Sequence, residues 1–147
     1  MQYDRLLGML IRSILIGALA FFAASAAEKS IKQADLPAAV RETLPANTAG
    51  AEIRNIVKET SKGKTVYEVE TVKDGLSHDQ IFSASGALLE TEQQVTLESL
   101  PAASRAALEA KARGAKIEKV EALTKGGKVT YEAAIDRNGK KSEITAK

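Results

Sequence analysis

The sequence lacks cysteine and tryptophan and contains a single histidine. Without cysteine the chain forms no disulfide, has no thiol nucleophile and offers no thiolate to a metal ion. One histidine cannot complete a zinc site that needs two or more imidazoles. A glycine-rich phosphate loop is also absent, and no serine stands in a recognisable nucleophile setting. We therefore expect no enzyme activity, no cofactor and no bound metal.

Strong charge of either sign is lacking as well. The formal net charge is +2 at pH 7, and acidic and basic residues are interspersed. Nucleic-acid binding needs a marked excess of positive charge, which this chain does not have. Aromatic residues make up only 4% of the chain, although Trp and Tyr dominate the hot spots of tight interfaces. The composition argues against a nucleic-acid partner and against a very tight inhibitor.

The N-terminal segment has the pattern of a secretory signal peptide. Arg5 and Arg12 supply positive charge, residues 14–22 form an apolar run, and small residues follow up to Ala26. We expect cleavage near Ala26 and a periplasmic or secreted bacterial protein, which meets the membrane only during export. The alternative is an uncleaved membrane anchor, although the apolar run is shorter than the roughly 20 residues that a spanning helix needs.

The rest of the chain repeats itself at a constant offset of 64 positions, so that Leu36-Pro37 returns as Leu100-Pro101. Such self-similarity indicates one supersecondary unit used twice. We predict a signal peptide at 1–26, a first repeat at 27–95 and a second repeat at 96–147 that lacks its last strand. Further matched pairs are Tyr67 with Tyr131, Glu68 with Glu132, and Gly75 with Gly139.

Each repeat is predicted to begin with a helix, with Asp35 or Ser99 as its N-cap and a proline in its first turn. An antiparallel meander follows, because apolar and polar residues alternate in stretches such as 64–73 and Asp74-Gly75 is a hairpin turn sequence. We expect an α+β fold with three- to four-stranded sheets side by side and helices on one face. Alternatively, strands at the junction pair into one continuous sheet, whose open face would be a binding surface.

The order of these motifs resembles the PepSY-like family, which is related to the fold of β-lactamase inhibitory protein (BLIP-like). The resemblance covers nearly all of the chain after the signal peptide. It implies tandem repeats of a helix plus an antiparallel sheet and a non-catalytic role in binding other proteins, with secreted peptidases as a suggested target class. The residues that carry it are Leu36, Pro37, Val40, Ile53, Tyr67, Glu68, Val69, Gly75, Gly86, Leu88, Leu100, Pro101, Ile117, Tyr131, Glu132 and Gly139.

The candidate contact residues lie in loops and on one sheet face. The partner-binding candidates are Asp74, Leu76, Ser85, Ala87, Glu68, Glu70, Lys125, Lys128 and Glu132. The positions expected to be structural are Leu36, Pro37, Tyr67, Gly75, Leu100, Pro101, Tyr131 and Gly139, with both tyrosine rings filling the core under a helix. His78 is expected at a solvated surface. The glutamates at alternating strand positions, which include Glu90 and Glu92, are expected on a wet outer face.

The function favoured by these observations is binding of another exported protein, with inhibition or modulation of a secreted peptidase or other hydrolase as the specific form. One alternative is a small-ligand or metal-responsive periplasmic binding protein that uses the acidic stripe. Another is a structural protein of the cell envelope. The sequence does not specify the oligomeric state.

Overall fold

The structure is a computed structural model that describes residues 27–61 and 63–147. Two α-helices, α3 (Ala38–Thr48) and α4 (Ala102–Ala112), follow the short 3-10 helices η1 (Gln33–Asp35) and η2 (Leu97–Ser99). In the described part of the chain no helix is long and apolar enough to cross a membrane. The strands are β1 (Ala27–Ser30), β2 (Glu52–Ser61), β3 (Lys64–Lys73), β4 (Leu76–Ser83), β5 (Leu88–Val95), β6 (Lys116–Lys125), β7 (Lys128–Arg137) and β8 (Lys140–Ala146).

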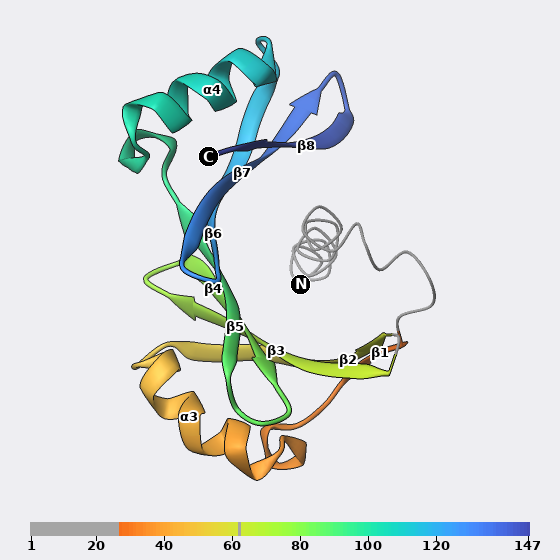
Figure 1. The fold of residues 1–147 in the computed structure, drawn as a ribbon. Helices are drawn as coiled ribbons and strands as arrows, with labels where there is room; N and C mark the ends of the chain where they lie inside the picture. Colours follow the sequence, from red (N-terminus) through yellow and green to blue (C-terminus); the bar gives the residue numbers. More distant parts are fainter. Residues whose placement is uncertain (1–26, 62) are drawn as a thin grey trace.

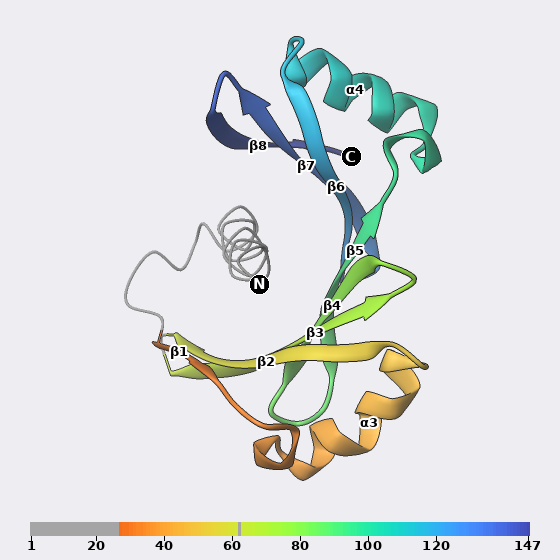
Figure 2. The ribbon, with the colours of Figure 1, turned by 180° about the vertical axis from the view of Figure 1, so that it is seen from behind.

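The eight strands form one antiparallel sheet, in which each strand pairs with the next one along the chain. The sheet curves, and α3 and α4 both lie on the outer side of the curve (Figure 1). The view from behind shows the same arrangement (Figure 2). Neither described α-helix covers the face on the inside of the curve, which we call the inner face. The predicted signal peptide and its cleavage site lie outside the described residues.

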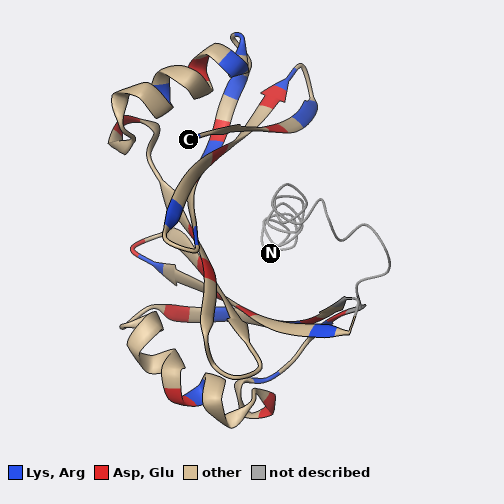
Figure 3. Cartoon of the chain, in the orientation of Figure 1, with Lys and Arg blue, Asp and Glu red and all other residues tan. Residues whose placement is uncertain are grey.

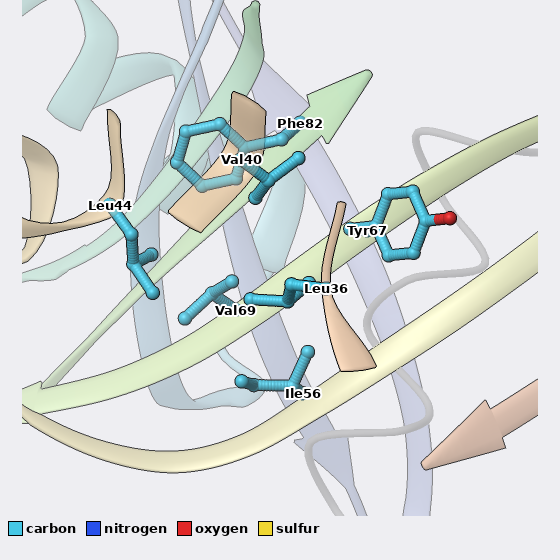
Figure 4. Close-up of a cluster of buried hydrophobic side chains, with 7 residues drawn as sticks. All are labelled: Leu36, Val40, Leu44, Ile56, Tyr67, Val69 and Phe82. Atoms are coloured by element: carbon cyan, nitrogen blue, oxygen red, sulfur yellow. The ribbon is translucent and has the colours of Figure 1, made fainter. Parts of the chain in front are cut away.

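Each helix packs on the sheet through its own cluster of buried apolar side chains. Tyr67 lies within the first cluster, and Tyr131 lies half-buried against the second. Both rings stand on the strand face that the helices cover, as expected for residues that alternate with outward-pointing neighbours. The first cluster, shown in Figure 4, is Leu36, Val40, Leu44, Ile56, Tyr67, Val69 and Phe82; the second is Leu100, Leu108, Val120, Ala133 and Ala146.

The predicted α+β class, with two sheets side by side, is wrong. β5 and β6 pair continuously from Glu90 opposite Lys125 to Val95 opposite Val120, so a single sheet runs through the molecule. Strands hold far more of the described chain than the two helices of 11 residues each. The physical reason is that two small sheets would each leave an edge of unpaired backbone groups, and pairing these edges satisfies both.

The bounds of α3, β2 and β3 recur in α4, β6 and β7 at the offset of 64 residues seen in the sequence. β8 corresponds in the same way to β4 and forms one edge of the sheet. β1, which pairs with β2 at the other edge, was not expected. The division of the chain into 27–95 and 96–147 stays a prediction.

The helix starts also differ from the prediction. Asp35 and Ser99 end the two 3-10 helices, and the N-cap positions of α3 and α4 are Pro37 and Pro101. The α conformation is disfavoured for a residue that precedes proline, so the leucine before each proline is extended and the α-helix begins after the proline. The Asp35 carboxylate instead accepts a hydrogen bond from the backbone N–H of Lys32, at 3.3 Å.

Candidate functional site on the inner face of the sheet

The inner face carries an acidic row. Successive strand residues point to opposite faces, so Glu68 and Glu70 of β3 point away from the helix-covered side that holds Tyr67 and Val69. The strand register continues this face across the sheet, and acidic positions mark these strands in Figure 3. The acidic row consists of Glu59, Glu68, Glu70, Asp79, Glu90, Glu92, Glu121, Glu132 and Glu143.

Most of the acidic row is buried, which corrects the expectation of a wet outer face. Glu68 and Glu92 are each 5% exposed, and Glu90 and Glu132 are each 6% exposed. Alternation along a strand predicts which face a residue is on, but not how crowded that face is. On the inside of a curved sheet the side chains of neighbouring strands converge, which brings these carboxyl groups close to one another.

This crowding changes the acidity of the carboxyl groups. Burial, and then the charge of Asp79, raises the pKa of Glu68 to about 9. Burial, and then the charge of Glu121, raises the pKa of Glu92 to about 8. Burial raises the pKa of Asp79 to about 7, against the opposing effect of Lys119. The row therefore contains carboxyl groups whose ionised form is disfavoured at neutral pH unless a positive charge joins them.

Three carboxylates meet at the centre of the row. Asp79 of β4, Glu92 of β5 and Glu121 of β6 each place one carboxylate oxygen within 4.8 Å of the others, and all three residues are buried. Asp79 lies directly opposite Glu92. Glu121 lies opposite Gln94, the next residue of β5 on the same face. We call these three residues the carboxylate cluster.

Two lysines of the inner face pair with members of the acidic row. The Lys119 ammonium lies 2.5 Å from Glu121 Oε1, and the Lys125 ammonium lies 2.8 Å from Glu90 Oε2. Lys125 was predicted as a partner-binding residue, and its pairing with Glu90 joins β5 to β6. These two positive charges do not balance the whole row.

The turns that hold the predicted contact residues lie at two different ends of the strands. Phe82 lies opposite Leu88, and Glu90 lies opposite Lys125. The β4–β5 turn, with Ser85 and Ala87, therefore shares one end of the strands with the β6–β7 turn between Lys125 and Lys128. The β3–β4 turn, with Asp74, Gly75 and Leu76, lies at the opposite end. No single contact surface made of loop tips includes all three turns.

The remaining predicted residues lie as follows. His78 is half-buried on the helix-covered face, beside Gln80. Its neighbour Asp79 points to the inner face, so the two do not share a site. Leu36 and Leu100 are buried, and Gly139, like Gly75, forms a hairpin turn with positive φ.

Asp79 and Glu121 are not among the site residues predicted from the sequence. The sequence shows that Asp79, like Glu90 and Glu92, is an acidic residue within a predicted strand. To place Asp79, Glu92 and Glu121 side by side, however, the pairing register of three strands must be known. A single sequence does not provide that register.

A shallow cleft of about 770 Å³ lies between the end of α4 and strands β7 and β8. Its basic residues have structural roles. The Arg137 guanidinium donates hydrogen bonds to the carbonyl oxygens of Ala112 and Arg113, at the end of α4, and the Lys111 ammonium donates to the carbonyl oxygen of Thr145. The cleft is therefore part of the packing of α4 on the sheet.

The curved sheet with both helices on its outer side allows a comparison with solved structures. No protein-family model and no curated protein matches the chain. In fold the chain is similar to a BLIP-like protein. That BLIP-like protein comes from Bacteroides fragilis, with 22% identity and a TM-score of 0.54 over 73% of this chain and 75% of the other.

Two further solved structures are similar to this chain in fold. A candidate periplasmic protein from Bacteroides eggerthii has 17% identity and a TM-score of 0.61, over 75% of this chain and 80% of that chain. A DUF2874 family protein from Bacteroides ovatus has 14% identity and a TM-score of 0.59, over 75% and 79%. The predicted BLIP-like fold is confirmed by these similarities, whereas the closer resemblance to the PepSY-like family stays a prediction.

Proposed function

We propose that this chain is a non-catalytic protein-binding module that presents the inner face of its sheet to another exported protein. The observation that carries this proposal is a broad sheet face that neither described α-helix covers and that concentrates charge. Complementary charge speeds and orients protein association. The half-buried Glu70 and Glu143, on opposite sides of the carboxylate cluster, are suited to contact a partner with a positively charged surface.

The specific form of this function is inhibition or modulation of a secreted peptidase or other hydrolase. It is supported by the similarity in fold to a BLIP-like protein. We also propose that the protein is exported to the periplasm or secreted. Its support is the signal-peptide pattern of residues 1–26 together with the similarity to a candidate periplasmic protein.

The test is capture of partners from a bacterial periplasmic extract. The full chain with a C-terminal tag serves as bait, alongside a Glu70→Lys/Glu143→Lys double variant. We expect a captured hydrolase to lose activity as the chain is added, and the double variant to bind it at least about tenfold more weakly, because two attractive charges become repulsive.

The matched control is Glu98→Lys/Glu109→Lys, which makes the same charge change at exposed residues of η2 and α4. Equal loss of binding in both double variants would indicate a non-specific charge effect and contradict a role for the inner face. Capture that neither double variant weakens would also contradict it.

One observation favours a second function, that of a metal-responsive binding protein. The carboxylate cluster brings together three oxygen ligands from three strands, an arrangement that the sequence did not predict.

A further inference from the structure

The carboxylate cluster has the dimensions of a cation site. Calcium ions bind oxygen ligands at about 2.3–2.6 Å, so two ligands of one calcium ion lie no more than about 5 Å apart. The ligand atoms of Asp79, Glu92 and Glu121 lie within 4.8 Å of one another. Each side chain also has a second oxygen, so Glu121 can keep its pair with Lys119 and still contact an ion.

The cluster is short of positive charge. Three carboxylates converge here, and among the described residues the one ammonium group paired with a member of the cluster is that of Lys119, which pairs with Glu121. Carboxylates are costly to bury unless they are paired or bound to a metal. One divalent cation in addition to Lys119 would balance the three negative charges.

A separate observation also points to a missing ligand. Glu68, on β3 beside β4, is 5% exposed, and its Oε1 atom has no hydrogen-bond partner among the described residues. Its side chain is on the same face as the cluster, and the negative charges of Asp79 and Glu92 contribute to its raised pKa. On the other side of the cluster, Glu132 Oε2 is buried and unpartnered in the same way. Buried polar atoms are normally satisfied, so each of these oxygens lacks a hydrogen-bond donor or a cation, and the negative charges around them favour a cation.

We propose that Asp79, Glu92 and Glu121 bind one calcium ion at the centre of the inner face, with Glu68 as a flanking carboxylate. The all-oxygen ligand set favours a hard cation over zinc, which prefers nitrogen and sulfur ligands. Calcium fits better than magnesium, which keeps several of its waters and is bound by only one or two protein carboxylates. This inference does not depend on the proposed binding of a protein partner.

The experiment is calcium titration of the full chain after EDTA treatment, by isothermal titration calorimetry and thermal unfolding. We expect one ion per chain and a Tm rise of about 5–10 °C at a calcium concentration about 100-fold above Kd. Glu92→Gln should weaken binding by more than about tenfold, because it removes a charged ligand. Glu109→Gln, on the exposed surface of α4, should bind as the unaltered chain does.

The choice of Glu92→Gln separates a loss of calcium binding from a loss of folding. Glu92→Gln removes a buried like charge, so it should fold at least as well as the unaltered chain, and circular dichroism checks this. Absence of both heat and thermal shift would overturn the proposal, and so would equal affinity in Glu92→Gln. A thermal shift produced by oligolysine but not by calcium would also overturn it, and would assign the acidic row to a basic peptide instead.

Discussion

Glu68 shows how a curved sheet changes the chemistry of a single side chain. In the sequence it is one of several glutamates at alternating positions, whereas in the fold it is buried among like charges. Its pKa rises to about 9 from an ordinary value of 4.5, chiefly through burial. Between these two values the folded chain holds a proton that the unfolded chain has lost. The free energy of unfolding therefore falls as the pH rises through this range.

Replacing Glu68 by Gln is expected to flatten this dependence. The amide does not ionise, so Glu68→Gln should be more stable than the unaltered chain at about pH 8, and the difference should shrink towards about pH 5. Urea unfolding at both pH values, in buffers with EDTA, measures the effect. Glu98→Gln, at an exposed position, is the control and should follow the unaltered chain. Parallel pH profiles for Glu68→Gln and the unaltered chain would show that burial of Glu68 has no such effect.

At the scale of elements, the β4–β5 turn is held against α3. The Thr43 hydroxyl donates a hydrogen bond to the carbonyl oxygen of Gly86, at 3.3 Å. Gly86 has a φ of +82°, and a Cβ at this position would lie 2.5 Å from the carbonyl oxygen of Ala39. This turn was predicted as a partner-binding loop, but its glycine serves the packing of helix on sheet.

Gly86→Ala should therefore cost more stability than an ordinary glycine replacement. We expect about 2–4 kcal/mol, because positive φ and a backbone clash act together. Gly75→Ala is the matched control, since it has a φ of +80° with nothing within 4 Å of the added Cβ, and should cost about 1–2 kcal/mol. Chemical unfolding of both variants measures the difference. Equal costs would show that the contact with α3 adds nothing.

The elements themselves were largely predictable from the chain. Alternation over residues 64–73 gives β3 with the observed bounds, and the Asp74-Gly75 turn follows from its preference for positive φ. These features depend on neighbours in sequence. The helix starts were misplaced because the leucine before each proline was not recognised as extended. The carboxylate cluster was missed because it depends on the register between strands.

At the scale of the whole molecule, the sequence left open whether the strands form two sheets or one continuous sheet. A strand pattern defines two faces but says little about which edges meet. The pairing of β5 with β6 gives one continuous sheet, which was the alternative to two sheets side by side, and the acidic row lies on the inside of its curve. The fold class was wrong because strands of this one sheet hold far more of the described chain than the two α-helices do, although helix and strand positions were close.

A continuous sheet predicts that the two apolar clusters unfold together. Leu44→Ala and Leu108→Ala, each in a different cluster, should each cost about 2–5 kcal/mol. Each variant should lower the hydrogen-exchange protection of β2–β4 and of β6–β8 alike, in one unfolding transition. Leu76→Ala, at a residue 40% exposed, should change stability by no more than about 0.5 kcal/mol. Loss of protection confined to one end of the sheet would show two independent units.

The order of strands also bears on how the chain reaches its native state. Since each strand pairs with its neighbour along the chain, contacts between strands close short loops, and only the two helical connections lengthen them. Folding rates rise as the mean sequence separation of contacts falls. The meander can therefore grow hairpin by hairpin, because a completed hairpin gives the next strand along the chain an edge to join.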